Sequence, residues 1–107
     1  MYKTFDISKT GLTKNTIDKI CGCIKRFPEI QSVIIYGSRA KGDYKNGSDI
    51  DLCLLGKDLD SGIILKLDNI LDELYLPYTF DISIYDKIDN PNFKDHIDRV
   101  GMMICKN

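Results

Sequence analysis

The sequence has one histidine, no long apolar run and almost no net charge. A lone histidine, His96, leaves a zinc site or a Ser-His-Asp triad without support. No run approaches the roughly 20 apolar residues of a membrane-spanning helix, and the first residues lack the apolar core of a signal peptide. A formal charge of −1 gives no general attraction for nucleic acid. We therefore expect a cytoplasmic protein with no membrane partner and no direct nucleic-acid binding.

Length and cysteine usage limit the architecture. The 107 residues suffice for one domain, which we expect to span 1–107, and 43% hydrophobic with 29% charged residues is typical of a soluble globular protein. Cys21 and Cys23 lie two residues apart on a predicted helix, so they face different ways and do not share a metal ion. Cys53 and Cys105 fall in predicted strands. We expect all four to be reduced structural thiols.

The most informative stretch is the loop between two short apolar runs, residues 33–36 and 52–55, each of which reads as a buried strand. Asp49 and Asp51 lead into the second run. Because side chains alternate along a strand, the two carboxylates are expected on one face, where they repel each other unless a cation binds between them. Oxygen ligands suit Mg²⁺, so the pair is a candidate half of a magnesium site.

The start of the same loop has the residues of a phosphate cradle. Gly37 and Ser38 follow the first run directly, where exposed backbone N–H groups and a hydroxyl can hold phosphate oxygens. Positive charge gathers next to this point. Ser38 could instead cap the turn after the strand, and the basic residues could instead form a solvated charged surface. We favour phosphate binding for Arg39, and the role of Lys45 stays open. The candidate nucleotide-binding set is Gly37, Ser38, Arg39, Lys41 and Ser48.

The rest of the chain alternates helical and strand patterns. Helical spacing predicts one helix capped by Thr13 and ended by Pro28, and a second that begins at Asp60 or Ser61 and is closed by Pro77. A third helix follows an Asn90–Pro91 start and stops at Gly101. Strands are expected at residues 78–85 and 102–105, and residues 1–11 read as an arm that packs late or against a partner. The order predicts an α/β fold: a small mixed β-sheet with helices packed mainly on one face.

Asp81 completes the candidate site. It lies in the middle of the strand predicted at residues 78–85, between Phe80 and Ile82, where a carboxylate has no packing role. The polar face of this strand can lie beside Asp49 and Asp51. Three close carboxylates can hold two Mg²⁺ ions for an in-line displacement at phosphorus. The alternative is that Asp81 caps a turn or faces water on an edge strand.

These motifs together resemble a known family. Gly37-Ser38, ten intervening residues and Asp49-Ile50-Asp51 are similar to the signature of the nucleotidyltransferase superfamily that includes DNA polymerase β. The tighter pattern, Gly-Ser-Arg-Ala-Lys-Gly followed by Gly-Ser-Asp-Ile-Asp-Leu, resembles the minimal nucleotidyltransferase (MNT) group. The resemblance implies the polymerase β-like fold over nearly the whole chain. It also implies that Asp49, Asp51 and Asp81 are the metal-binding and catalytic residues, with ATP as substrate.

The resemblance further implies a partner. MNT proteins are commonly made with a helical HEPN-family protein, so we expect an antitoxin that transfers AMP from ATP to a hydroxyl, such as a tyrosine, of a HEPN-type ribonuclease toxin. A homodimer or a hetero-oligomer both stay open. Two other functions also stay open: a binding module that neutralises its partner without catalysis, and a small-molecule nucleotidyltransferase of the antibiotic-resistance type, against which the short chain counts.

Overall fold

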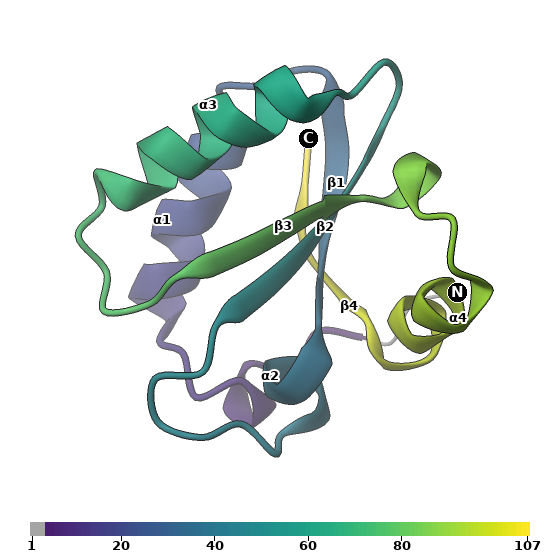
Figure 1. Ribbon diagram of the computed structural model, residues 1–107. Helices are drawn as coiled ribbons and strands as arrows, with labels where there is room; N and C mark the ends of the chain where they lie inside the picture. The colour runs from purple at the N-terminus through teal and green to yellow at the C-terminus, as the bar shows by residue number, and fades with distance from the viewer. Residues whose placement is uncertain (1–3) are drawn as a thin grey trace.

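Four strands form one mixed sheet in the order β3-β2-β1-β4 in the computed structural model, which describes residues 4–107 (Figure 1). β1 is antiparallel to both β2 and β4, whereas β2 and β3 are parallel and α3 connects them. The elements are η1 (Ile7–Lys9), α1 (Lys14–Ile24), β1 (Ile30–Tyr36), α2 (Gly37–Lys41), β2 (Ile50–Gly56), α3 (Ser61–Asp72), β3 (Phe80–Ile84), η2 (Tyr85–Lys87), α4 (Pro91–Val100) and β4 (Met102–Lys106).

Short-range hydrogen bonds begin the three longer helices where the sequence predicts them. The Thr13 hydroxyl accepts the Thr16 N–H at the start of α1, and the Asp60 carboxylate accepts the Ile63 N–H at the start of α3. At α4 the Asn90 side chain accepts two backbone N–H groups, and Pro91 occupies the first helical position. These predicted helix starts are confirmed.

The strand alternation divides the apolar side chains between two faces of the sheet. One face, with Val33, Ile35, Leu52 and Leu54, packs against α1 and α3 and forms the main core. The other face, with Ile34, Tyr36 and Cys53, packs against Ile97 of α4 in a smaller cluster. Two of the longer helices thus cover one face and the third covers part of the other. The fold class is the predicted one, and the uncovered part of the second face holds the candidate site.

The N-terminal segment is more firmly packed than the sequence suggests. Phe5 and Ile7 pack against the main core, and Thr10 is fully buried. The Thr10 hydroxyl donates to the Ile7 carbonyl and accepts the Leu12 N–H, which closes the turn before α1. The predicted arm therefore packs within the protein over residues 4–11, and the alternative that it packs against a partner is wrong there. That it packs late stays a prediction, and the first three residues of the arm lie outside the described part of the chain.

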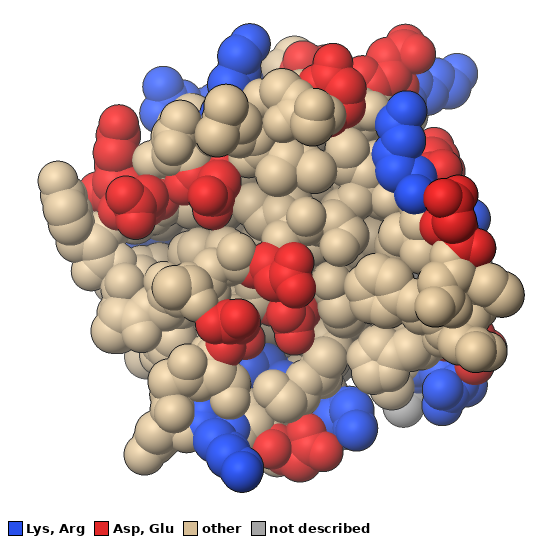
Figure 2. All heavy atoms as spheres, in the orientation of Figure 1, with Lys and Arg blue, Asp and Glu red and all other residues tan. Residues whose placement is uncertain are grey.

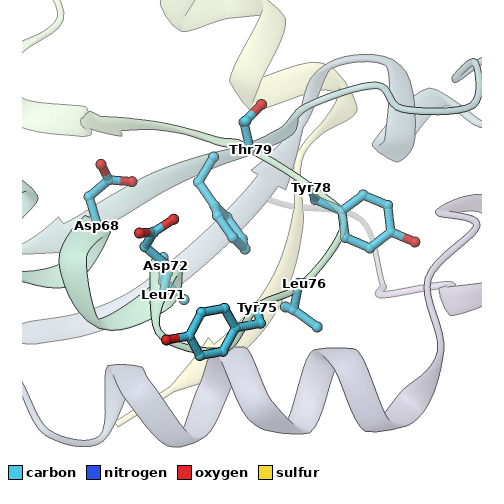
Figure 3. Close-up of a pocket in the computed structure, with 8 residues that line it drawn as sticks. Asp68, Leu71, Asp72, Tyr75, Leu76, Tyr78 and Thr79 are labelled. Carbon is cyan, nitrogen blue, oxygen red and sulfur yellow. The ribbon is translucent and has the colours of Figure 1, made fainter.

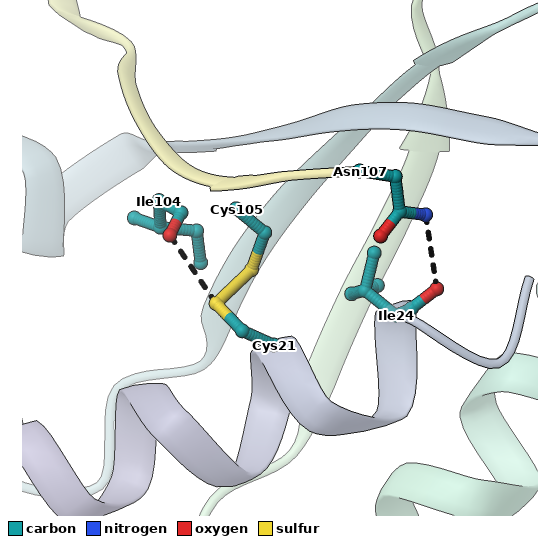
Figure 4. The surroundings of a disulfide bond; sticks show 5 residues. All are labelled: Cys21, Ile24, Ile104, Cys105 and Asn107. Carbon is teal, nitrogen blue, oxygen red and sulfur yellow. Dashed lines mark hydrogen bonds between the residues drawn. A yellow bond between two sulfur atoms is a disulfide. The ribbon is translucent and has the colours of Figure 1, made fainter. Parts of the chain in front are cut away.

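A disulfide bond joins Cys21 of α1 to Cys105 of β4, with the two Cα atoms 5.5 Å apart (Figure 4). The prediction of four reduced thiols is wrong for this pair and holds for Cys23 and Cys53, which are free and buried. The single-sequence argument missed the bond because β4 pairs with β1 from the far end of the chain. Nearby, the Asn107 side-chain amide donates to the carbonyl of Ile24 and to two further carbonyls beyond α1 (3.2, 3.0 and 2.6 Å).

We expect loss of the disulfide to destabilise the fold without rearranging it. The bond closes a loop with a sequence separation of 84 residues, so Cys105→Ser should lower the free energy of unfolding by about 3–5 kcal/mol. Denaturant titration measures this difference. A reductant should destabilise the wild type and leave the variant unchanged, whereas equal sensitivity of both proteins would contradict the bond.

Candidate active site

The three predicted aspartates meet where β2 and β3 begin. Asp49 immediately precedes β2, and Asp51 is its second residue. The parallel register pairs Asp51 with Asp81, and the antiparallel register with β1 pairs Asp51 with Tyr36. Figure 2 shows acidic side chains gathered near the centre of this face of the molecule, with basic side chains below them beside α2. The predicted proximity of the two strands' polar faces is confirmed.

Thr79 ties Asp49 to the neighbouring strand. Its hydroxyl donates to the Asp49 carboxylate, and its carbonyl accepts the N–H of Ile50 at 2.9 Å. Sequence reasoning did not single out Thr79. The available signal was its position two residues before Asp81, which places both side chains on one face of an extended chain.

Gly37 touches the aspartate cluster directly. It begins α2 with φ at +74°, a conformation that favours glycine, and a β-carbon there would clash with Oδ2 of Asp51. The backbone that leads into α2 and the Asp51 carboxylate therefore approach each other more closely than any side chain would permit. This contact brings the predicted phosphate cradle against the predicted metal ligands.

Like charges crowd the Asp51 carboxyl. Burial is the main cause that raises its pKa from 3.8 to about 6, and the negative charges of Asp81 and Asp49 raise it further, against a smaller lowering by Arg39. Tyr36, in the facing position on β1, has its pKa raised to about 12, chiefly by burial. Its hydroxyl lies 3.2 Å from the Ser83 hydroxyl. The site therefore carries concentrated negative charge in partly buried surroundings.

The three carboxylates are neighbours, but their oxygens do not surround a single position that a metal ion could occupy. Within residues 4–107, no three His, Cys, Asp or Glu side chains form a ready-made set of metal ligands. The donor set itself, three carboxylates at the starts of β2 and β3, has the oxygen chemistry that Mg²⁺ prefers. The assignment of Asp49, Asp51 and Asp81 as metal ligands remains a prediction.

The predicted nucleotide-binding residues divide into two groups. Gly37 and Ser38 open α2 beside Asp51, and Lys41 is half exposed at its end, 3.4 Å from the Asp43 carboxylate. Ser48 and Arg39 are instead engaged within the protein. The Ser48 hydroxyl accepts the Lys45 N–H, and its carbonyl accepts two N–H groups of Arg39, whose side chain is only 2% exposed. The structure does not present the Arg39 guanidinium to the cradle.

A pocket of about 470 Å³ lies beside the cluster, between the end of α3 and the start of β3 (Figure 3). Thr79 contributes both to this pocket and to the Asp49 contact. The other residues that line it are Asp68, Leu71, Asp72, Tyr75, Leu76, Tyr78 and Phe80. Its two carboxylates, Asp68 and Asp72, disfavour a triphosphate, because like charges repel.

Comparison with known proteins shows the family. The polymerase beta nucleotidyltransferase family matches residues 18–107, and the chain belongs to it. A curated relative, "Putative protein adenylyltransferase MJ0141" of Methanocaldococcus jannaschii, is 32% identical over 79 residues. The matched region is 71% of this chain and 80% of that protein. This chain is therefore a nucleotidyltransferase domain.

Solved structures show the same fold at lower sequence identity. A toxin–antitoxin structure with AMP-PNP superposes with a TM-score of 0.70 at 22% identity, covering 90% of this chain and 75% of the other. The complex of a tri-AMPylated Shewanella oneidensis HEPN toxin with its MNT antitoxin matches with a TM-score of 0.68 at 17% identity. That match covers 90% of this chain and 74% of the other.

The described part of this chain contains no helix long and apolar enough to cross a membrane.

Gly37→Ala should disturb the site more than the fold. The added carbon would displace the Asp51 carboxylate, so we expect Mn²⁺ with a non-hydrolysable ATP analogue to bind at least tenfold more weakly in calorimetry. Gly42→Ala is the matched control, because Gly42 also has a positive φ (+85°) but only ordinary contacts, 3.7 Å and beyond, around an added carbon. Both variants should lose about 1 kcal/mol of stability from backbone strain. Equal binding by both variants would contradict the role of Gly37.

Asp51→Asn should stabilise the metal-free protein at neutral pH. In the wild type the folded pKa of about 6 exceeds the unfolded 3.8, so the native state binds more protons and stability falls as pH rises between these values. The stability difference between variant and wild type should therefore grow from pH 3.5 to pH 7.5. An increase on the order of 1–2 kcal/mol is expected, discounted for partial exposure. Denaturant titrations measure it, and Asp68→Asn, which removes an exposed carboxylate on α3, is the matched control.

Proposed function

We propose that this protein is a Mg²⁺-dependent adenylyltransferase that transfers AMP from ATP to a hydroxyl of a protein partner. The observation that carries the proposal is the register pairing of Asp51 with Asp81, with Asp49 adjacent and the Gly37 backbone in contact with Asp51. The name of the curated relative supports adenylyl transfer to protein. The MNT antitoxin bound to an AMPylated HEPN toxin supports a HEPN-type ribonuclease as the partner and an antitoxin role.

Each part of the reaction has residues suited to it. The opening of α2 would hold the terminal phosphates: Tyr36 supplies no side-chain cap there, and backbone N–H groups at a helix start attract anions. Lys41 at the end of α2 adds positive charge nearby. Mg²⁺, two ions in our proposal, would be held by Asp49, Asp51 and Asp81, and would supply charge neutralisation at the reacting phosphate.

In-line geometry assigns the acceptor to the β3 side. With pyrophosphate departing toward α2, the hydroxyl must approach the α-phosphorus from the opposite direction, where Asp81 lies. The hydroxyl oxygen forms a bond to phosphorus, the bond to the bridging oxygen of pyrophosphate breaks, and Asp81 accepts the hydroxyl proton. Asp81 is exposed on an edge strand, so a partner's side chain can reach it. We propose a tyrosine as the acceptor.

A second candidate function is neutralisation of the partner by binding alone. It differs from transfer in needing no carboxylate cluster. The close placement of three mutually repelling aspartates favours catalysis, because their repulsion has no structural benefit for a passive binding surface.

Asp81→Asn separates the two functions. The variant should still associate with its proposed HEPN-type partner, but should lose at least 100-fold in the rate of AMP addition, because the hydroxyl loses its proton acceptor. Intact-protein mass spectrometry detects each AMP added, and size-exclusion chromatography reports association. Asp86→Asn, an exposed carboxylate beyond β3, is the matched control. Neutralisation of the toxin by Asp81→Asn, with no AMP addition by the wild type, would establish the binding-module function.

A further inference from the structure

Arg39 is the most completely enclosed charged side chain in the described part of the protein. It is 2% exposed, and each terminal group of its guanidinium is hydrogen bonded to backbone. Nε and Nη2 donate to the Ser48 carbonyl at 3.2 and 3.0 Å, and Nη1 donates to the Thr10 carbonyl at 2.7 Å. No ion pair to a carboxylate is found for Arg39 within residues 4–107. Its charge is therefore stabilised by peptide dipoles.

Two aromatic rings complete the enclosure. The Arg39 guanidinium carbon lies 4.8 Å from the centroid of the Tyr44 ring and 4.7 Å from that of the Tyr78 ring. These distances are those of cation–π contacts, which strengthen when the cation is removed from water. Gly11, the residue after Thr10, approaches the Tyr44 ring so closely that a β-carbon would overlap it. The whole arrangement is packed and excludes a phosphate from the guanidinium.

The groups that hold Arg39 lead directly to Asp49. Ser48 is bonded to it through the backbone, so the carbonyl that accepts two Arg39 N–H groups belongs to the Ser48–Asp49 peptide unit. Tyr78 precedes Thr79, whose hydroxyl donates to the Asp49 carboxylate. Arg39 thus contacts both segments that determine where the Asp49 carboxylate lies. One segment is the loop before β2, and the other is the start of β3.

We propose that Arg39 is a positioning residue that holds the Asp49 carboxylate in place for the metal, and that it does not contact the nucleotide. The assignment rests on the proposed function in one respect, because it takes Asp49 as a metal ligand. Two rigid attachments are needed because residues 43–49 are otherwise a loop with few hydrogen bonds of its own. Arginine suits the task, since its planar fork can bond two carbonyls while the cation also makes cation–π contacts with two rings.

The test compares four proteins: wild type, Arg39→Met, Arg39→Lys and a matched control, Arg26→Met. Arg26 is exposed and lies in the segment between α1 and β1. The site lies at the opposite end of β1, after Tyr36, so Arg26 is remote from it. Binding of Mn²⁺ alone is followed by electron paramagnetic resonance, and binding of ATP analogue at saturating Mn²⁺ by calorimetry. Hydrogen exchange reports the opening of residues 43–49. If Arg39→Met fails to fold, Tyr78→Leu replaces it, because it removes one stacking ring and leaves the guanidinium bonds.

We expect both Arg39 variants to bind Mn²⁺ about 10- to 100-fold more weakly, as for other residues that orient metal ligands. Nucleotide affinity at saturating Mn²⁺ should change less than threefold, residues 43–49 should exchange faster, and the control should match wild type. A lysine that restores Mn²⁺ affinity would overturn the proposal, because charge alone would then suffice. So would normal Mn²⁺ affinity with weakened nucleotide binding, which would make Arg39 a phosphate ligand.

The same experiment separates this inference from the proposed function. If wild type binds no Mn²⁺, the metal assignment of the aspartates fails, and hydrogen exchange then decides the role of Arg39. Faster exchange of residues 43–49 in Arg39→Met, with unchanged exchange in the control, retains Arg39 as the residue that positions this loop. If residues 43–49 exchange at the wild-type rate in Arg39→Met, as in the control, then the positioning role of Arg39 is overturned as well.

Discussion

Three carboxylates that repel one another are held side by side, and much of the surrounding structure serves to keep them there. Asp51 and Asp81 are fixed by the register of two parallel strands, so neither can withdraw without breaking the sheet. Asp49 is retained by a hydroxyl from the neighbouring strand. The stability that offsets this repulsion comes from the main core on the opposite face, where Leu52, Leu54 and Leu67 are fully buried. The site and the core thus lie on opposite faces of the same strands.

The sequence predicts local features of this arrangement well because they depend on neighbouring residues. Caps at Thr13, Asp60 and Asn90 and the alternation that gives Asp81 a polar face all follow from short-range rules. The pairing of the Asp49–Asp51 segment with the Asp81 strand is also predictable from the shared polar face. Helix starts, strands and the three-aspartate set could therefore be proposed before the structure.

Other features depend on contacts between distant parts of the chain, and single-residue patterns do not reveal them. Arg39 lies among residues suited to phosphate, yet its guanidinium is enclosed by Thr10 and by two tyrosines from separate loops. The Cys21–Cys105 bond likewise requires knowledge that β4 returns beside α1. A close approach at Gly37 follows from its place in the motif, but the group that a β-carbon there would meet, the Asp51 carboxylate, depends on such a distant contact.

The disulfide has a consequence for the integrity of the chain after cleavage. Because it joins the first long helix to the last strand, every loop around the site lies within one covalent ring. A single proteolytic cut in the exposed segment before β2 would open that ring and leave both fragments attached through sulfur. The strand carrying Asp51 and the helix carrying Gly37 would then stay part of one molecule, able to reassemble at the high effective concentration of a tethered pair.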